Sequence, residues 1–171
     1  MEEIQQQSCN EVTWHDYLKD PSVPFDERLD RWEQFITQFD QVDCNLEHSF
    51  PEGMYVRKIT MPAGSIIVSR IHNFDNPFFI TRGKLSVVSE NEGIVEYTAP
   101  FMGITKPNTR RILFIHEETD WTTVHLNPEN SRNIEEIENR LTYMKPSTLA
   151  LREQNLKDSN AIRKELDLCH S

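Results

Sequence analysis

Cysteines are few in this sequence, and long apolar runs are missing. The three cysteines, Cys9, Cys44 and Cys169, lie far apart in 171 residues and form no CxxC pair. This spacing argues against a disulfide framework or a zinc knuckle and favours a reducing compartment. No apolar stretch approaches the roughly 20 residues that cross a bilayer, and the acidic start MEEIQQQSCNEV is unlike a secretory signal. We therefore expect a soluble, cytoplasmic protein with no membrane partner.

Positive charge is also scarce. The chain has 28 acidic and 18 basic residues, which gives a formal net charge of −10. This field repels nucleic-acid phosphates, and the pair Arg110-Arg111 is too short to make a basic stripe, so we expect no nucleic-acid partner. The motifs of nucleophilic and nucleotide chemistry are missing too, since no G-x-S-x-G elbow, P-loop or G-x-G-x-x-G occurs.

What the chain does contain is two kinds of periodicity. Residues 1–50 are expected to form a helical extension, with an apolar stripe of Leu29, Trp32, Phe35, Ile36, Phe39 and Val42 on a helix near 25–42. Residues 51–127 alternate β-branched runs with turn signals such as ENEG at 90–93, which is typical of a small β-barrel or sandwich. Residues 128–171 are expected to form a second helical extension, with a helix near 131–144 capped by Ser131.

The segment 64–83 and the residues after Pro107 carry two recognisable motifs. The first has the form G-x5-H-x-H-x3/4-E-x6-G, and its frame falls on Gly64, Arg70, His72, Asn76 and Gly83. The second ends P-x-G-x2-H-x3-N, and its frame falls on Pro107, Thr109, Ile112 and His116. Residues 54–126 thereby resemble the cupin family. The resemblance implies a mainly β protein: a cupin-type antiparallel β-barrel, or jelly roll, here with α-helical extensions at both ends.

In the cupin family the motif positions bind a metal, but this chain has replaced most of the ligands. Arg70, Asn76 and Ile112 stand at three of the four ligand positions, and only His72 is unchanged. A permanent cation repels a metal and isoleucine cannot bind one, so we expect no catalytic metal and no cofactor. An alternative set stays open: His72, Asp75 and His116 form a two-histidine, one-carboxylate group if His116 points into the barrel beside Ile112.

The arginines suggest a different ligand. Arg57, Arg70, Arg110 and Arg111 lie on or beside predicted strands, and their planar forks suit a carboxylate or a phosphate. The alternative is that each pairs with a neighbouring acidic residue. Trp121 offers a surface for a sugar ring, or simply packs in the core. The candidate ligand-binding residues are Arg70, His72, Asn76, Arg110, His116 and Trp121.

Three functions are compatible with these patterns. The first is a non-catalytic cupin-like protein that acts by self-association or partner binding, for example a phage-type structural, assembly or accessory protein. The second is a small-molecule binder for a sugar phosphate or an organic acid. The third is a metal-dependent cupin enzyme that uses His72, Asp75 and His116. The lost ligands favour a protein that is not an enzyme. The polar segment 147–171, with apolar Leu149, Leu156, Ile162 and Leu166, predicts a homo-oligomer.

Overall fold

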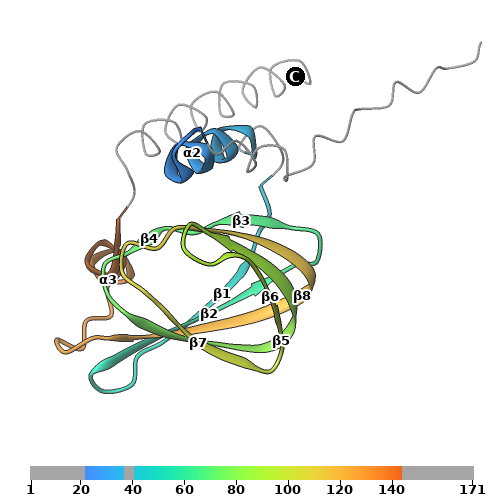
Figure 1. Cartoon of the computed structure of the whole chain (residues 1–171). Helices are drawn as coiled ribbons and strands as arrows, with labels where there is room; N and C mark the ends of the chain where they lie inside the picture. The colour runs from blue at the N-terminus through green and yellow to red at the C-terminus, as the bar shows by residue number, and fades with distance from the viewer. Residues whose placement is uncertain (1–21, 37–40, 144–171) are drawn as a thin grey trace, which may run out of the picture.

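The computed structural model describes residues 22–36 and 41–143 and shows a mainly β protein (Figure 1). Among these residues, seven strands form one sheet in the order β1-β2-β8-β5-β6, with β3 also pairing with β8 and β7 with β5. A second, two-stranded sheet joins β4 and β9. The elements are α2 (Phe25–Ile36), β1 (Asn45–Ser49), β2 (Met54–Met61), β3 (Ile66–Val68), β4 (Ile71–His72), β5 (Asn76–Ser89), β6 (Gly93–Thr98), β7 (Phe101–Thr105), β8 (Arg111–Leu126), α3 (Ile134–Leu141) and β9 (Thr142–Tyr143).

All strand pairs described are antiparallel, and the predicted fold class is confirmed. The two long strands shape the barrel, because each pairs with different neighbours along its length. The first half of β5 pairs with β7 and the second half with β6. The change comes at Gly83, where the register with β8 shifts and φ is +91°. A Cβ at this position would lie 2.3 Å from the Glu118 carbonyl oxygen, so only glycine fits the bend.

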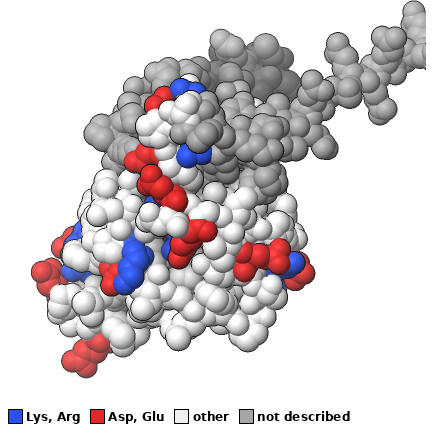
Figure 2. All heavy atoms as spheres, viewed as in Figure 1, with Lys and Arg blue, Asp and Glu red and all other residues white. Residues whose placement is uncertain are grey.

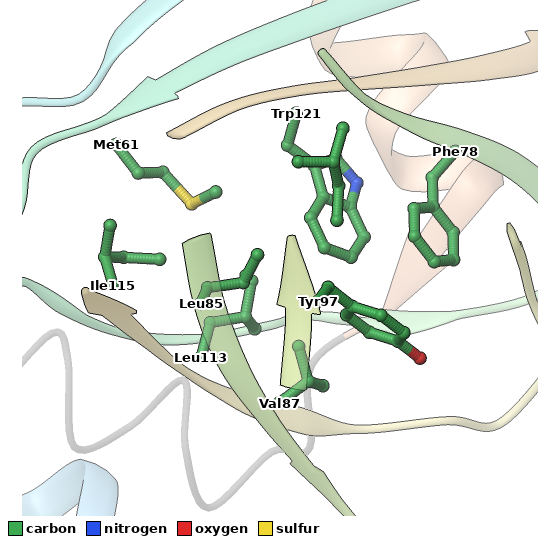
Figure 3. Packing of buried hydrophobic residues seen from close by; sticks show 9 residues of the cluster. Met61, Phe78, Leu85, Val87, Tyr97, Leu113, Ile115 and Trp121 are labelled. Atoms are coloured by element: carbon green, nitrogen blue, oxygen red, sulfur yellow. The ribbon is translucent and has the colours of Figure 1, made fainter. Parts of the chain in front are cut away.

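Inward-facing side chains fill one end of the barrel with apolar groups. Strand alternation places every second residue of β2 and β8 inside, so that Met61 and Trp121 face the interior. Trp121 stacks on Phe78, with ring centroids 4.2 Å apart. Figure 3 shows this core, to which β2, β5, β6 and β8 contribute Met61, Phe78, Ile80, Leu85, Val87, Tyr97, Leu113, Ile115 and Trp121.

Helix α2 covers part of the outer surface of the barrel (Figure 1). Its Leu29 and Trp32 pack against Ile112 and Phe114 of β8, which confirms that the apolar stripe predicted for this helix faces the sheet. The helix ends at Ile36, and residues 37–40 lie outside the described residues. The expected extension to Val42 is wrong, because Val42 lies beyond the helix and is 49% exposed.

Several predicted boundaries need correction. Two strands are longer than the short β-branched runs expected over 51–127: β5 spans 14 residues and β8 spans 16, because each bends without breaking its ladder. Strands β1 and β9 lie in segments for which we expected only helix. Residues 144–171, including the apolar set predicted to meet a second copy, lie outside the described residues.

The start of α3 also differs from the prediction. Asn133, not Ser131, is the N-cap, since its side-chain oxygen accepts a hydrogen bond from the Glu136 backbone N–H at 3.3 Å. Ser131 Oγ accepts from the Asn133 N–H at 3.2 Å and so holds the residue that caps the helix. No helix of the described residues has both the length and the apolar character needed to cross a membrane.

Candidate functional site

The other end of the barrel interior is lined with polar side chains. On the inward face of β2, Tyr55 lies opposite His125 and Arg57 opposite Thr123 of β8. Asn76 of β5 lies opposite Thr105 of β7. We call the following inward residues the polar cluster: Tyr55, Arg57, His72, Asn76, Thr105, Arg111, Thr123 and His125.

Two arginines give the polar cluster its charge. Arg111 opens β8 and is 6% exposed; its Nη1 donates to Thr105 Oγ1 at 3.1 Å, and its Cζ lies 5.7 Å from the Phe78 ring centroid. The Nε atoms of Arg57 and Arg111 are buried without a hydrogen-bond partner among the described residues. In the same part of the chain neither arginine forms an ion pair, whereas Arg70 and Arg82 do. Their charges are therefore not neutralised by a contacting carboxylate.

Two histidines stack between these arginines and Tyr55. The rings of His72 and His125 lie 6.1 Å apart at 11°, and His125 lies 5.9 Å from the Tyr55 ring. Burial, followed by the charges of Arg111 and Arg57, lowers the pKa of His72 to about 4. Burial, followed by His72 and Arg57, lowers the pKa of His125 to about 4. Both imidazoles are thus neutral at neutral pH, and each can accept one hydrogen bond and donate one.

Helix α3 and strand β9 hold His72 in place. β4, which carries His72, pairs with β9, so that His72 lies opposite Thr142. The next residue, Asn73, donates its backbone N–H to the Leu141 carbonyl at 2.9 Å and its side-chain Nδ2 to the Arg140 carbonyl at 2.8 Å. Ile137 and Leu141 of α3 pack against Tyr55. The helix after the barrel thereby covers the polar cluster on its Tyr55 side.

Buried polar atoms without partners among the described residues make this end of the barrel the candidate site. Asn76 is 1% exposed, and its Oδ1 has no hydrogen-bond partner among the described residues. His72 Nδ1 and the Nε atoms of Arg57 and Arg111 are also buried without a hydrogen-bond partner among the described residues. A buried polar group that lacks a hydrogen bond costs free energy, and native proteins rarely tolerate several together. Four such atoms lie in the polar cluster, and each of them is open to a hydrogen bond.

The donor set does not fit the metal that the cupin resemblance implies. Among the described residues, no three His, Cys, Asp or Glu side chains lie close enough together to hold a metal ion. The polar cluster contains no carboxylate, and two arginines stand within it, where they would repel a cation. We derive no metal chemistry from this site.

The structure separates the alternative set of His72, Asp75 and His116. Asp75 lies at the surface and pairs with Lys106 at 3.2 Å. His116 is exposed, and its Nε2 lies 2.7 Å from Ser86 Oγ. The expectation that His116 points into the barrel is wrong, because its face of β8, shared with Ile112 and Phe114, is the outer one, packed against α2.

The remaining candidates lie in three different environments. Arg70 is exposed and pairs with Glu138 of α3 at 3.1 Å. Arg110 is buried on the outer face, where it pairs with Glu33 at 2.6 Å and with Asp30. Trp121 belongs to the apolar core. Of the six predicted ligand-binding residues, the structure therefore brings only His72 and Asn76 into the polar cluster.

Surface charges elsewhere pair among themselves. On the face shown in Figure 2, basic and acidic side chains lie next to one another, and exposed pairs such as Lys84–Glu96 at 2.9 Å and Arg82–Glu118 at 2.6 Å are typical. From the sequence, pairing with an acidic residue was the alternative to ligand binding for each arginine. Arg70 and Arg110 form such ion pairs, whereas Arg57 and Arg111 form none among the described residues.

Known proteins resemble this chain in fold. No family model and no curated protein matches the sequence. Among solved structures, an RmlC-like cupin family protein with a double-stranded β-helix fold from Methanocaldococcus jannaschii is 15% identical, covering 53% of this chain and 86% of its own, with a TM-score of 0.44. A cupin-2 domain containing protein from Shewanella frigidimarina is 10% identical, covering 61% of this chain and 94% of its own, with a TM-score of 0.40.

An enzyme is among the similar structures as well. Ectoine synthase from P. lautus is 14% identical, covering 53% of this chain and 67% of its own, with a TM-score of 0.45. These similarities concern the fold alone.

Proposed function

We propose that the protein binds a small anionic organic molecule at the polar end of its barrel, through Arg57 and Arg111 and without a metal. The observation that carries this proposal is the pair of buried arginine Nε atoms that have neither a hydrogen-bond partner nor an ion pair among the described residues. An arginine fork binds carboxylate and phosphate oxygens through strong, charge-assisted hydrogen bonds. Phosphate-bearing sugars and organic acids are the ligands that this chemistry suits.

The neighbouring residues support binding more than catalysis. A general base works best when its pKa is near the operating pH, and the pKa values of His72 and His125 are about 4. The polar cluster also lacks a carboxylate that could exchange a proton with a substrate. In our proposal His72 and Asn76 offer uncharged hydrogen-bonding groups that orient the ligand, while the arginines supply the binding energy.

Isothermal titration calorimetry with inorganic phosphate and with succinate tests the proposal. We expect at least one of these anions to bind. Arg111→Met should weaken the affinity for that anion on the order of tenfold to hundredfold, because a hydrogen bond to a charged group contributes about 1.5–3 kcal/mol. Arg82→Met is the matched control, since this arginine is exposed and pairs with Glu118 and Asp120. Absence of binding by both anions, or equal binding by Arg111→Met, would contradict the proposal.

A second candidate function is self-association, and the outer surface of the sheet favours it. Lys58, Thr122, Phe79 and Met102 form one register row across β2, β8, β5 and β7. Met102 and the nearby Ile104 are 67% and 55% exposed. We propose that a second copy of the chain covers this apolar face. A structural or assembly role of the phage type would use the same surface.

A further inference from the structure

We infer that the anion bound by the polar cluster carries two negative charges, as a phosphate monoester or a dicarboxylate does, and that singly charged analogues bind poorly. This inference rests on the proposed anion-binding function and adds the charge of the ligand. It follows from the balance of charges inside the barrel.

Both arginines contribute a permanent charge to the same small volume. Arg57 lies opposite Thr123 on the inward face of β2, and Arg111 donates to Thr105 across the same end of the barrel. Burial is the largest cause of the lowered pKa of His72, and the charges of Arg111 and Arg57 add to it. Burial lowers the pKa of Arg111 itself, which means that its charge is poorly solvated where it stands. Neither arginine has an ion-pair partner among the described residues, so a ligand must supply the opposing charge.

The nearest acidic groups act from outside the polar cluster. Glu92 opposes the effect of burial on the pKa of Arg111, but its carboxylate lies 3.5 Å from Ser89 Oγ in the β5–β6 turn. Burial raises the pKa of Tyr55 and the charge of Glu138 adds to this effect, but the Glu138 carboxylate pairs with Arg70 at 3.1 Å. These carboxylates weaken the field of the arginines without contacting either guanidinium. A monoanion would balance one arginine and leave the buried Nε of the other without a partner, which is costly.

The histidines make the charge of the site constant over a useful pH range. Because the pKa values of His72 and His125 are about 4, both rings remain neutral between pH 5.5 and 8. Any change of affinity for a phosphate monoester over this range therefore reports mainly the second ionisation of the ligand, whose pKa is about 6. About a quarter of the monoester is doubly charged at pH 5.5 and nearly all of it at pH 8, so the apparent affinity should fall about fourfold on acidification.

The experiment is calorimetry on the full chain with two matched ligand pairs, in which methylation removes one charge. These are methyl phosphate against dimethyl phosphate, and succinate against monomethyl succinate, each at pH 8 and pH 5.5. We expect the doubly charged member of at least one pair to bind tenfold or more tightly than its ester, since a second arginine contact is worth roughly that factor. The pair that shows the larger difference identifies the ligand as a phosphate or a dicarboxylate.

Variants of the two arginines complete the test. Arg57→Met and Arg111→Met should each reduce the preference for the dianion to within about threefold, because one cation then remains. Arg111→Lys keeps the charge and should keep the preference even if overall affinity falls, and this variant covers the case in which a methionine variant does not fold. Equal binding of both members in each pair would overturn the dianion inference and leave anion binding intact. If none of the four compounds binds, the proposed function itself fails.

Discussion

His72 and His125 are neutral because two effects oppose their protonation together. Burial disfavours the charged form of each ring, and the arginine charges of the polar cluster add to this effect. Arg110, which directly precedes β8, and Arg111, its first residue, lie in opposite environments. Arg110 points outward and meets the carboxylates of α2, while Arg111 points inward and meets none in the described part of the chain. Alternation along one strand thus separates a structural arginine from a candidate ligand-binding one.

The lowered pKa values predict a pH-dependent stability. In the unfolded chain each histidine titrates near 6.5, and in the folded protein near 4, so acidification between these values protonates only the unfolded state. The free energy of unfolding should therefore fall as the pH drops from about 6.5 to about 4, by up to about 1.4 kcal/mol per pH unit for each ring. No such contribution is expected above pH 7.

Urea unfolding at a series of pH values measures this effect. A double variant, His72→Gln and His125→Gln, should show a shallower loss of stability between pH 6.5 and 4 than the unaltered chain, because glutamine does not titrate. The comparison cancels the carboxylates, which are common to both proteins. Parallel curves over this range would show that the two rings are not held neutral by the fold.

At the scale of elements, α2 is joined to the barrel by charge as well as by apolar contact. The Arg110 side chain is 6% exposed and that of its partner Glu33 is 4% exposed, with Nη2 and Oε2 2.6 Å apart. Asp30 contacts the same guanidinium through its Oδ1 atom. The helix carries Leu29 and Trp32 onto β8 on the same side. A buried charge on the sheet and two acids on the helix thus fix the register between them.

Removing one partner of this buried pair should be strongly destabilising. We expect Arg110→Met to lower the free energy of unfolding by about 3–5 kcal/mol, because the buried Glu33 and the part-buried Asp30 then lose their shared guanidinium partner. Arg31→Met is the control: its pair with Glu27 is more than half exposed and should contribute no more than about 0.5 kcal/mol. Denaturant unfolding followed by tryptophan fluorescence measures both. A loss no larger for Arg110→Met than for Arg31→Met would contradict the account.

The sequence predicted the mainly β structure of residues 51–127, which is confirmed. Of the first motif, His72 and Asn76 lie in the polar cluster, whereas Arg70 lies at the surface. It did not settle which face of β8 points inward, since RILFI is apolar on both faces and offers no period. The second motif favoured the face of Ile112 and His116, which proved to be the outer one. Arg111, on the opposite face, is not among the predicted ligand-binding residues. Arg57 and His125 come together only through the pairing of β2 with β8, which the sequence alone does not give.

At the scale of the whole molecule, the barrel interior and the protein's net charge have opposite signs. The chain carries a net charge of −10, while the polar cluster contains two arginines and no carboxylate. An anionic ligand is therefore repelled at a distance and attracted inside the barrel. The interior is also divided lengthwise, with the apolar core around Trp121 at one end and the polar cluster at the other. The outer face of β5 and β7 remains as an apolar surface that a second copy can cover.

If two copies associate through that face, a single charge introduced into it should separate them. In sedimentation analysis at micromolar concentration we expect the chain, of 20.1 kDa, to sediment as a dimer, and Ile104→Glu to convert it to monomer. Ile94→Glu is a closely matched control, because Ile94 is 54% exposed against 55% for Ile104 but lies on β6. A monomer in all three proteins, or dissociation by both substitutions, would contradict the assignment of this face.

The central claim is that the polar end of the barrel binds an anion between Arg57 and Arg111. Crystals grown or soaked with selenate, a doubly charged oxyanion with a strong anomalous signal, test it most directly. The account predicts an anomalous peak inside the barrel, with selenate oxygens within hydrogen-bond distance of both guanidinium groups and of His72 or Asn76. Anomalous peaks confined to the protein surface, with only water between the two arginines, would contradict it.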